Sequence, residues 1–147
     1  MSISIRELST LRDAVAFQQV ERLVWGSDDE SLVPTHILIT LARNGGLVLG
    51  AYDETGPEQT DHLVGMTMGW YGKAIPHGQS EARIKFCSHM AGVLPAWQRK
   101  RVGLALKLAQ REWVQREGVT NWITWTYDPL YRANGVFNIH RLGAICT

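Results

Sequence analysis

A run of basic residues directly precedes a glycine at a predicted helix start, in the sequence QRKRVG over residues 98–103. The first backbone N–H groups of a helix have no intrahelical acceptor, and the helix dipole adds partial positive charge there. Such a helix start binds phosphate groups through its backbone. Donor side chains and positive charge just before it come from Gln98, Arg99, Lys100 and Arg101. The spacing predicts an anion site at Gly103, with a solvated basic turn or a nucleic-acid patch as the alternatives.

A strand on each side of this helix would fix the site in place. Residues 82–94 are an apolar run typical of a strand, which ends at Pro95. The helix is predicted over 102–117, and 121–127 (NWITWTY) is rich in the β-branched and aromatic residues of a strand. A strand–helix–strand order predicts that the two strands lie parallel and close together.

The predicted helix 102–117 has one apolar side. This side consists of Val102, Ala105, Leu106, Ala109 and Trp113. Lys107 and Arg111 are predicted to face away from it. The other predicted elements are a strand within 1–8, helices over 11–25 (capped by Thr10 and Asp13) and 35–43, strands over 46–52 and 62–70, a long flexible connection over 71–81 and a final helix over 134–142.

Composition indicates one domain, residues 1–147, with enough apolar residues (45%) for an ordinary core. The net charge of +1 argues against a general nucleic-acid binder, which usually carries a large basic excess. The two cysteines, Cys87 and Cys146, form no metal-binding pattern and indicate free thiols in a reducing compartment. The charged N-terminus is unlike a signal peptide, and no apolar run approaches the length of a membrane span. A cytoplasmic protein is expected.

The chain resembles the GNAT superfamily of acyl-CoA-dependent N-acetyltransferases, in particular an uncharacterised bacterial branch of predicted acetyltransferases. The phosphate motif of that family is Gln or Arg, two residues, Gly, one residue, then Gly or Ala, after a strand that ends in Val-x-Pro. Here Val93-Leu94-Pro95 ends the strand and residues 98–103 fill the motif, except that Arg101 replaces the first glycine. The segments LALKLAQREW, ITWTYDPL and NIHRLGA extend the resemblance from about residue 84 to the end.

The resemblance implies an α/β fold with a mixed, mostly antiparallel central sheet. Helices would cover both faces, and the fourth and fifth strands would splay apart in a V. The family pattern continues with a C-terminal hairpin, whereas this sequence stops at Thr147. An open sheet edge invites pairing with another chain, so we predict a homodimer or strand exchange through that edge.

The resemblance also implies transfer of an acetyl group from acetyl-CoA to a primary amine of a small molecule or peptide, by direct attack in a ternary complex and without a metal. The pantetheine arm would pair with the backbone of the strand, and the N–H of Val93 or a neighbour would stabilise the oxyanion. The implied CoA-binding residues are Gly92, Val93, Leu94, Gln98, Arg99, Lys100, Arg101, Val102, Gly103, Leu104, Ala105 and Asn134.

Three residues are candidates for proton transfer. Ser88 and His89 lie on the strand that would line the cleft, and only one of these neighbours can face it because strand faces alternate. A histidine is a competent base near pH 7, although a strand histidine is more often structural. The tyrosine that many family members use as the acid falls on Ile139 here, and Tyr131 is a nearby substitute.

Two other functions are compatible with the sequence. The departures at Arg101 and Ile139 fit a non-catalytic acyl-CoA-binding or scaffold domain of the same fold. An α/β interaction module without any nucleotide is the other alternative.

Overall fold

The computed structural model describes residues 2–147, which contain one sheet in the order β1-β2-β3-β4-β5. The strands are β1 (Ser4–Glu7), β2 (Leu47–Tyr52), β3 (Leu63–Ala74), β4 (Arg83–Val93) and β5 (Ile123–Thr124). The first three pairings are antiparallel, and only β4 and β5 are parallel.

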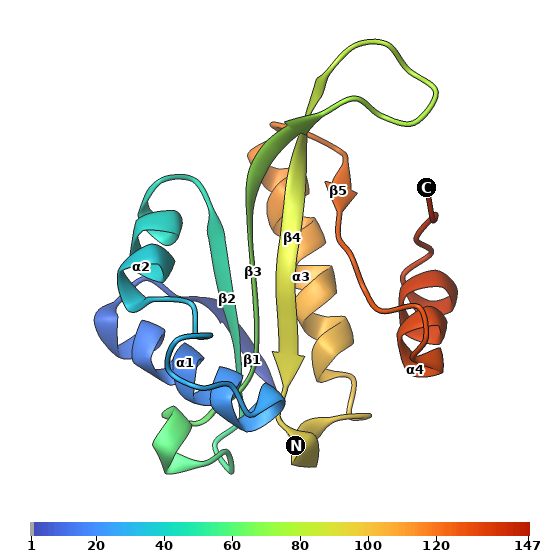
Figure 1. Cartoon of the computed structure of the whole chain (residues 1–147). Coiled ribbons are helices and arrows are strands. Elements are labelled where there is room, and N and C mark those ends of the chain that lie inside the picture. Colours follow the sequence, from blue (N-terminus) through green and yellow to red (C-terminus); the bar gives the residue numbers. More distant parts are fainter. Residues whose placement is uncertain (1) are drawn as a thin grey trace.

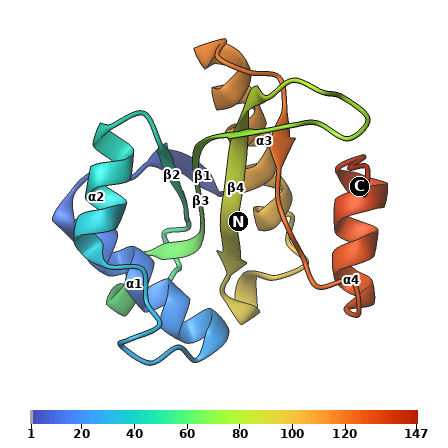
Figure 2. The same cartoon turned by 45° about the horizontal axis from the view of Figure 1, so that its top comes forward.

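Helices cover both faces of this sheet (Figures 1 and 2). They are α1 (Leu11–Trp25), α2 (Thr35–Arg43), α3 (Val102–Glu117) and α4 (Arg132–Gly135), which continues as a π-helical segment, Val136–Arg141. The indole of Trp25 in α1 lies against Gly92 of β4, whereas Val102 of α3 lies against Gly65 of β3. The two faces are therefore an α1 face and an α3 face, and the predicted mixed α/β fold class is confirmed.

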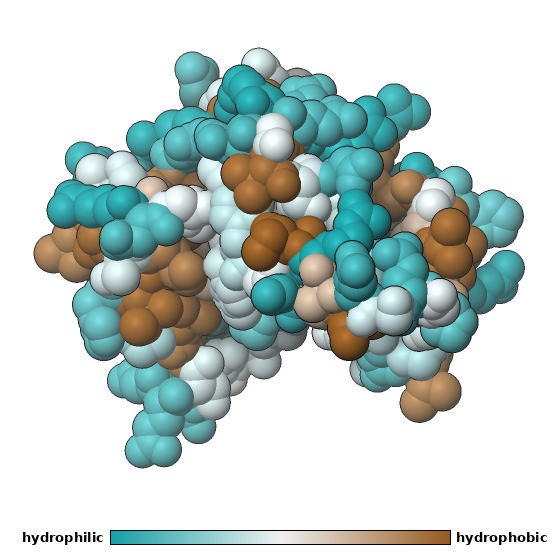
Figure 3. All heavy atoms as spheres, turned by 90° about the horizontal axis from the view of Figure 1, so that it is seen from above, coloured by the Kyte–Doolittle hydropathy of each residue, from teal (hydrophilic) through white to brown (hydrophobic). Residues whose placement is uncertain are grey.

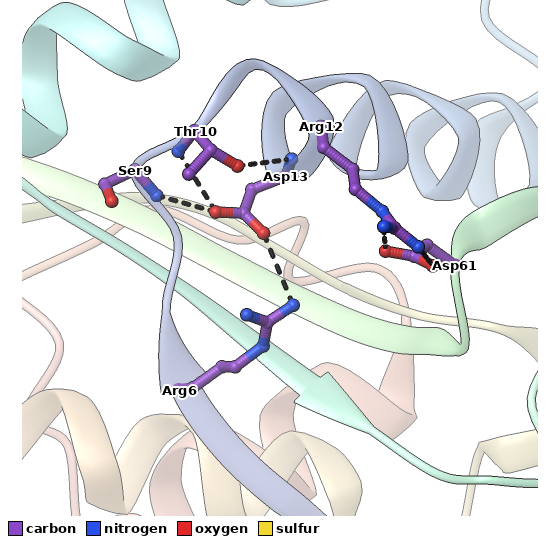
Figure 4. A network of polar contacts seen from close by, with 6 residues as sticks. All are labelled: Arg6, Ser9, Thr10, Arg12, Asp13 and Asp61. Carbon is purple, nitrogen blue, oxygen red and sulfur yellow. Dashed lines mark hydrogen bonds and ion pairs between the residues drawn. The ribbon is translucent and has the colours of Figure 1, made fainter.

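The start of α1 shows why the chain turns from β1 into a helix there. Thr10 and Asp13 form a capping box: the Thr10 hydroxyl accepts the Asp13 N–H at 3.1 Å, and the Asp13 carboxylate accepts the Thr10 N–H at 3.0 Å (Figure 4). Arg6 of β1 also bonds the same carboxylate at 3.3 Å. The guanidinium of Arg12, the residue before Asp13, pairs with Asp61 before β3. These contacts fix α1 over the sheet.

The core fills both interfaces between helices and sheet. On the α1 side, Phe17 and Val20 are fully buried. On the α3 side, Phe86 packs edge-on against Tyr71, with ring centroids 5.5 Å apart, and against Trp113 at 5.7 Å. Apolar side chains that remain exposed lie in separate groups with hydrophilic residues between them (Figure 3). Within residues 2–147, no helix is long and apolar enough to cross a membrane.

Three predicted boundaries were wrong. The connection predicted over 71–81 begins later, because Tyr71–Ala74 continue β3 and pair with the first residues of β4. The strand predicted over 121–127 is reduced to β5, Ile123–Thr124. The final helix starts at Arg132 rather than at Asn134. The predicted bounds of α1, α2 and α3 are confirmed.

Candidate functional site

The strands β4 and β5 separate after two residue pairs. Phe86 pairs with Ile123 and Cys87 with Thr124. From Ser88 onward β4 has β3 as its neighbour on one side and no strand partner on the other, within the described chain. In Figure 1 the chain after β5 runs away from β4 towards α4. This is the predicted V-shaped splay.

The free edge of β4 presents backbone groups in an alternating pattern. The N–H of Leu94 bonds to the carbonyl of Val64 at 2.9 Å, so it points towards β3. Donors of a strand in an antiparallel pair alternate between its two sides, so Ala91 and Val93 direct their backbone groups to the free edge. The Gln98 side chain donates to the Val93 carbonyl there at 3.1 Å.

The loop between β4 and α3 is fastened to the end of β2. The indole N–H of Trp97 donates to the carboxylate of Asp53 at 3.0 Å. Asp53 is buried, and hydrogen bonds from the backbone of Thr55, from Trp97 and from the Thr55 hydroxyl keep its pKa below the usual value. The Lys100 ammonium lies 5.8 Å from the centroid of the Trp97 ring. The basic loop is thus anchored at its base.

The start of α3 has the geometry of an anion site. Arg99 and Arg101 both have left-handed backbones, with φ of 62° and 64°, and Arg101 is the N-cap. The first helical bond runs from the Ala105 N–H to the Arg101 carbonyl at 2.9 Å. The N–H groups of the three residues between them, 102–104, have no intrahelical acceptor. Arg101 therefore adopts the conformation that the glycine of the family motif would supply.

Gly103 leaves room in front of these amides. A Cβ atom built on Gly103 would lie 3.7 Å from Val93 and 3.9 Å from Phe137, which are ordinary contacts. Phe137 belongs to the C-terminal π-helical segment, so this segment flanks the helix start.

The two candidate proton-transfer residues of β4 lie on opposite faces of the sheet. Met90 pairs with Met68 and Ser88 with Gly69, so His89 is the extra residue of a β-bulge. Ser88 is buried and bonded from α3, whereas His89 is exposed, with its ring centroid 5.0 Å from that of Trp70.

Lys107 does not face solvent, contrary to prediction. Its Nζ atom donates to the Ser88 hydroxyl at 2.7 Å and lies 4.9 Å from the centroid of the Trp125 ring. Burial lowers the pKa of Lys107 to about 8. The buried face of α3 is wider than its apolar stripe, since Gln110, three residues on, is also buried and bonds to Thr67 at 3.4 Å. Arg111 is exposed, as predicted.

The other predicted site residues of the C-terminal segment make local contacts. Tyr131 is 67% exposed and its backbone N–H bonds to the Asp128 carbonyl. The Asn134 side chain donates to the same carbonyl at 3.3 Å. Neither contact involves β4 or α3. Asn138, which is buried, instead accepts the Trp125 indole N–H at 2.7 Å and so joins this segment to the residue that directly follows β5.

A groove lies elsewhere on the molecule. This groove, of about 400 Å³ between β1 and α3, is lined by Ile5, Glu7 and Trp113, and also by Ala105 from the predicted CoA site. Among residues 2–147, no group of three or more His, Cys, Asp or Glu side chains is placed to hold a metal ion.

The fold is that of the GNAT N-acetyltransferases. AAC(6')-Iy, solved with the bisubstrate analogue CoA-S-monomethyl-acetylneamine, matches with a TM-score of 0.76 at 13% identity over 100% of this chain and 93% of that one. The aminoglycoside 6'-N-acetyltransferase AAC(6')-Ih from Acinetobacter baumannii matches with 0.73 at 15% identity over 99% and 92%. The aminoglycoside acetyltransferase meta-AAC0020 from an uncultured soil metagenomic sample, solved with sisomicin, matches with 0.69 at 20% identity over 99% and 91%.

No family model and no curated protein matches the chain. The structural matches, at 13–20% identity, therefore define the fold and leave the activity to be argued from the site.

Proposed function

We propose that this protein is an acetyl-CoA-dependent N-acetyltransferase that moves an acetyl group to a primary amine by direct attack in a ternary complex. The observation that carries the proposal is the free edge of β4, which leads directly to a helix start with unpaired amides. A strand-like cofactor arm with a phosphate end fits that combination.

The two ends of the cofactor would bind different parts of this site. Its pyrophosphate would accept from the free amides of 102–104, with the side chains of Arg99, Lys100 and Arg101 nearby. Its pantetheine arm would pair with Ala91 and Val93 on the β4 edge. One of these two N–H groups would then stabilise the oxyanion that forms on the thioester oxygen.

The acceptor amine would approach from the α1 face, because the phosphate end of the cofactor occupies the α3 face. The side chains of Trp25, Trp70 and His89 lie on that face. Tryptophan rings attract cations, and His89 could take the proton that the amine must lose before it attacks. The loop after Trp25 also carries three acidic residues, at 28–30.

The matching structures support direct attack and indicate which amines to test first. A bisubstrate analogue joins CoA to the acceptor in one molecule, so AAC(6')-Iy holds the two in adjoining sites. Aminoglycosides therefore come first in an acceptor panel, followed by polyamines and peptide amines. The free thiols of Cys87 and Cys146 support a reducing, cytoplasmic location.

Two measurements test the proposal on the wild-type chain: calorimetry with acetyl-CoA, and release of free thiol from acetyl-CoA in the presence of the amine panel. We expect binding, and thiol release that depends on an amine. Binding without release for any amine would favour the non-catalytic acyl-CoA-binding domain. Failure to bind would overturn the cofactor site.

Gly103 provides a matched pair of variants for the phosphate site. Gly103→Glu places a negative charge in front of the free amides, so we expect the affinity for acetyl-CoA to fall by at least about 100-fold. Gly103→Ala should stay within a few-fold of wild type, because its Cβ meets no atom closer than 3.7 Å. Unchanged affinity in Gly103→Glu would contradict a phosphate site at this helix start.

A further inference from the structure

The Lys107 ammonium lies at the closed end of the V, where the last pair between β4 and β5 ends. Ser88, which accepts its hydrogen bond, is the first residue of β4 beyond the last pair with β5. Trp125, whose ring faces the ammonium, is the first residue after β5. The lysine therefore bridges the two strands at the point where they separate.

No carboxylate neutralises this ammonium within the described part of the chain, where the ion pairs involve other residues. Its two partners are uncharged. Of the other titratable groups nearby in these elements, His89 lies on the opposite face and the Tyr127 hydroxyl bonds with Cys146. The exposed ones are Arg111, Glu112, Asp128, His140 and Arg141. Desolvation is accordingly what lowers the pKa of Lys107.

A half-buried cation without a counter-ion is costly, and it becomes favourable when an anion forms beside it. Acyl transfer from a thioester generates such an anion, the CoA thiolate. With the pantetheine arm on the free edge of β4, the sulfur end of the cofactor points towards Ser88 and the closed end of the V.

We propose that Lys107 is the general acid of the acyl transfer and protonates the departing CoA thiolate. This inference rests on the proposed acetyltransferase function. The amine nitrogen forms a bond to the carbonyl carbon and gives its extra proton to solvent. The tetrahedral intermediate then re-forms the carbonyl and breaks its C–S bond. The electron pair of that bond stays on sulfur, which takes a proton from the Lys107 ammonium. Solvent returns a proton to the lysine.

The Ser88 hydroxyl and Asn138 act as positioning residues in this scheme. Ser88 holds the ammonium at 2.7 Å, and Asn138 holds the Trp125 indole that covers it at 2.7 Å. A lysine whose pKa is about 8 is well matched to this task, since protonation of the thiolate gives a thiol with a pKa of roughly 8.5 and proton transfer between matched groups is efficient.

The test compares Lys107→Met, Lys107→Arg and the control Arg111→Met, which removes an exposed charge one turn further along α3. We expect Lys107→Met to lower kcat by about 100-fold, the lower end for general acid catalysis, with the affinity for CoA changed less than threefold. The control Arg111→Met should match wild type in kcat and in the affinity for CoA. Thermal unfolding of each variant checks that it is folded.

The pH dependence of kcat separates an acid from a structural lysine. An acid must be protonated, so wild-type kcat should fall as the pH rises through about 8. Lys107→Met lacks the titrating group, and Lys107→Arg stays charged, so both should lose this alkaline limb.

Two results would overturn the assignment while leaving the acetyltransferase intact: full kcat with an unchanged alkaline limb in Lys107→Met, or acetylation of Lys107 in each turnover, detected by mass spectrometry. A wild-type chain that binds acetyl-CoA but never releases thiol would instead remove the proposed function, and this inference with it.

Discussion

At the scale of single residues, Arg101 in the basic loop combines a favourable charge with an unfavourable backbone conformation. Arg101 supplies positive charge next to the helix start, but its backbone is left-handed, with φ of 64°. A side chain in this region costs roughly 1–2 kcal/mol relative to glycine. Charge near the predicted phosphate site is thus obtained at the expense of folding stability.

Arg101→Gly should therefore stabilise the fold by about 0.5 kcal/mol, since relief of backbone strain exceeds the added entropy of the unfolded chain. Urea unfolding measures the change. Arg101→Ala is the control, because it removes the same charge and keeps the strain. Equal stability of the two variants would show that the left-handed backbone at 101 is not strained.

Glu21 gives a second prediction at this scale. Its carboxylate is buried in α1 and accepts the Val33 N–H at 3.2 Å, and burial raises its pKa. The folded state then binds the proton more tightly than the unfolded state, so stability falls as the pH rises through the range between the ordinary glutamate pKa and the raised one.

Glu21→Gln should be more stable than wild type at pH 7, by about 1 kcal/mol, because the amide keeps the acceptor without the charge. The advantage should vanish at about pH 3, where the wild-type carboxyl is protonated in both states. Urea unfolding at the two pH values measures this, with Glu117→Gln as an exposed control. An advantage that does not change with pH would refute the explanation.

At the scale of elements, the Trp97–Asp53 bond ties the loop between β4 and α3 to the end of β2. Trp97→Phe keeps the ring but removes the donor to buried Asp53. We expect a loss of about 1–2 kcal/mol in unfolding free energy and a several-fold weaker affinity for acetyl-CoA. Trp122→Phe, which changes a half-buried indole elsewhere, is the matched control. Weaker affinity in the control alone would contradict this role.

The sequence predicted those elements whose signals are local. The Thr10–Asp13 capping box and Gly118 fix the ends of α1 and α3, and the structure agrees with both. The length of β5 depends on its partner, because the chain leaves β4 after Thr124 and a strand without a ladder does not form. The buried position of Lys107 likewise depends on Ser88 and Trp125, which are 19 and 18 residues away in sequence.

At the scale of the whole molecule, the β4 edge can be approached from either face of the sheet. The start of α3 and Lys107 lie on one face, whereas Trp25, Trp70 and His89 lie on the other. A cofactor and an acceptor could thus meet at the β4 edge without competing for space. The homodimer predicted from the open sheet edge stays a prediction, which sedimentation analysis can decide.

The brief ladder between β4 and β5 has a consequence for motion. Beyond that ladder, residues 125–147 meet the rest of the protein where the Trp125 ring faces Lys107 and where Phe137 lies beside Gly103 at the start of α3. The Trp125–Asn138 bond is internal to this part. Because it makes few contacts, this part should unfold locally far more often than the sheet does. In hydrogen–deuterium exchange, its amides should exchange quickly in the free protein and slow at least about tenfold when CoA is added, while those of β2 and β3 barely respond. Binding of the cofactor would then itself stabilise the C-terminal segment against this local unfolding.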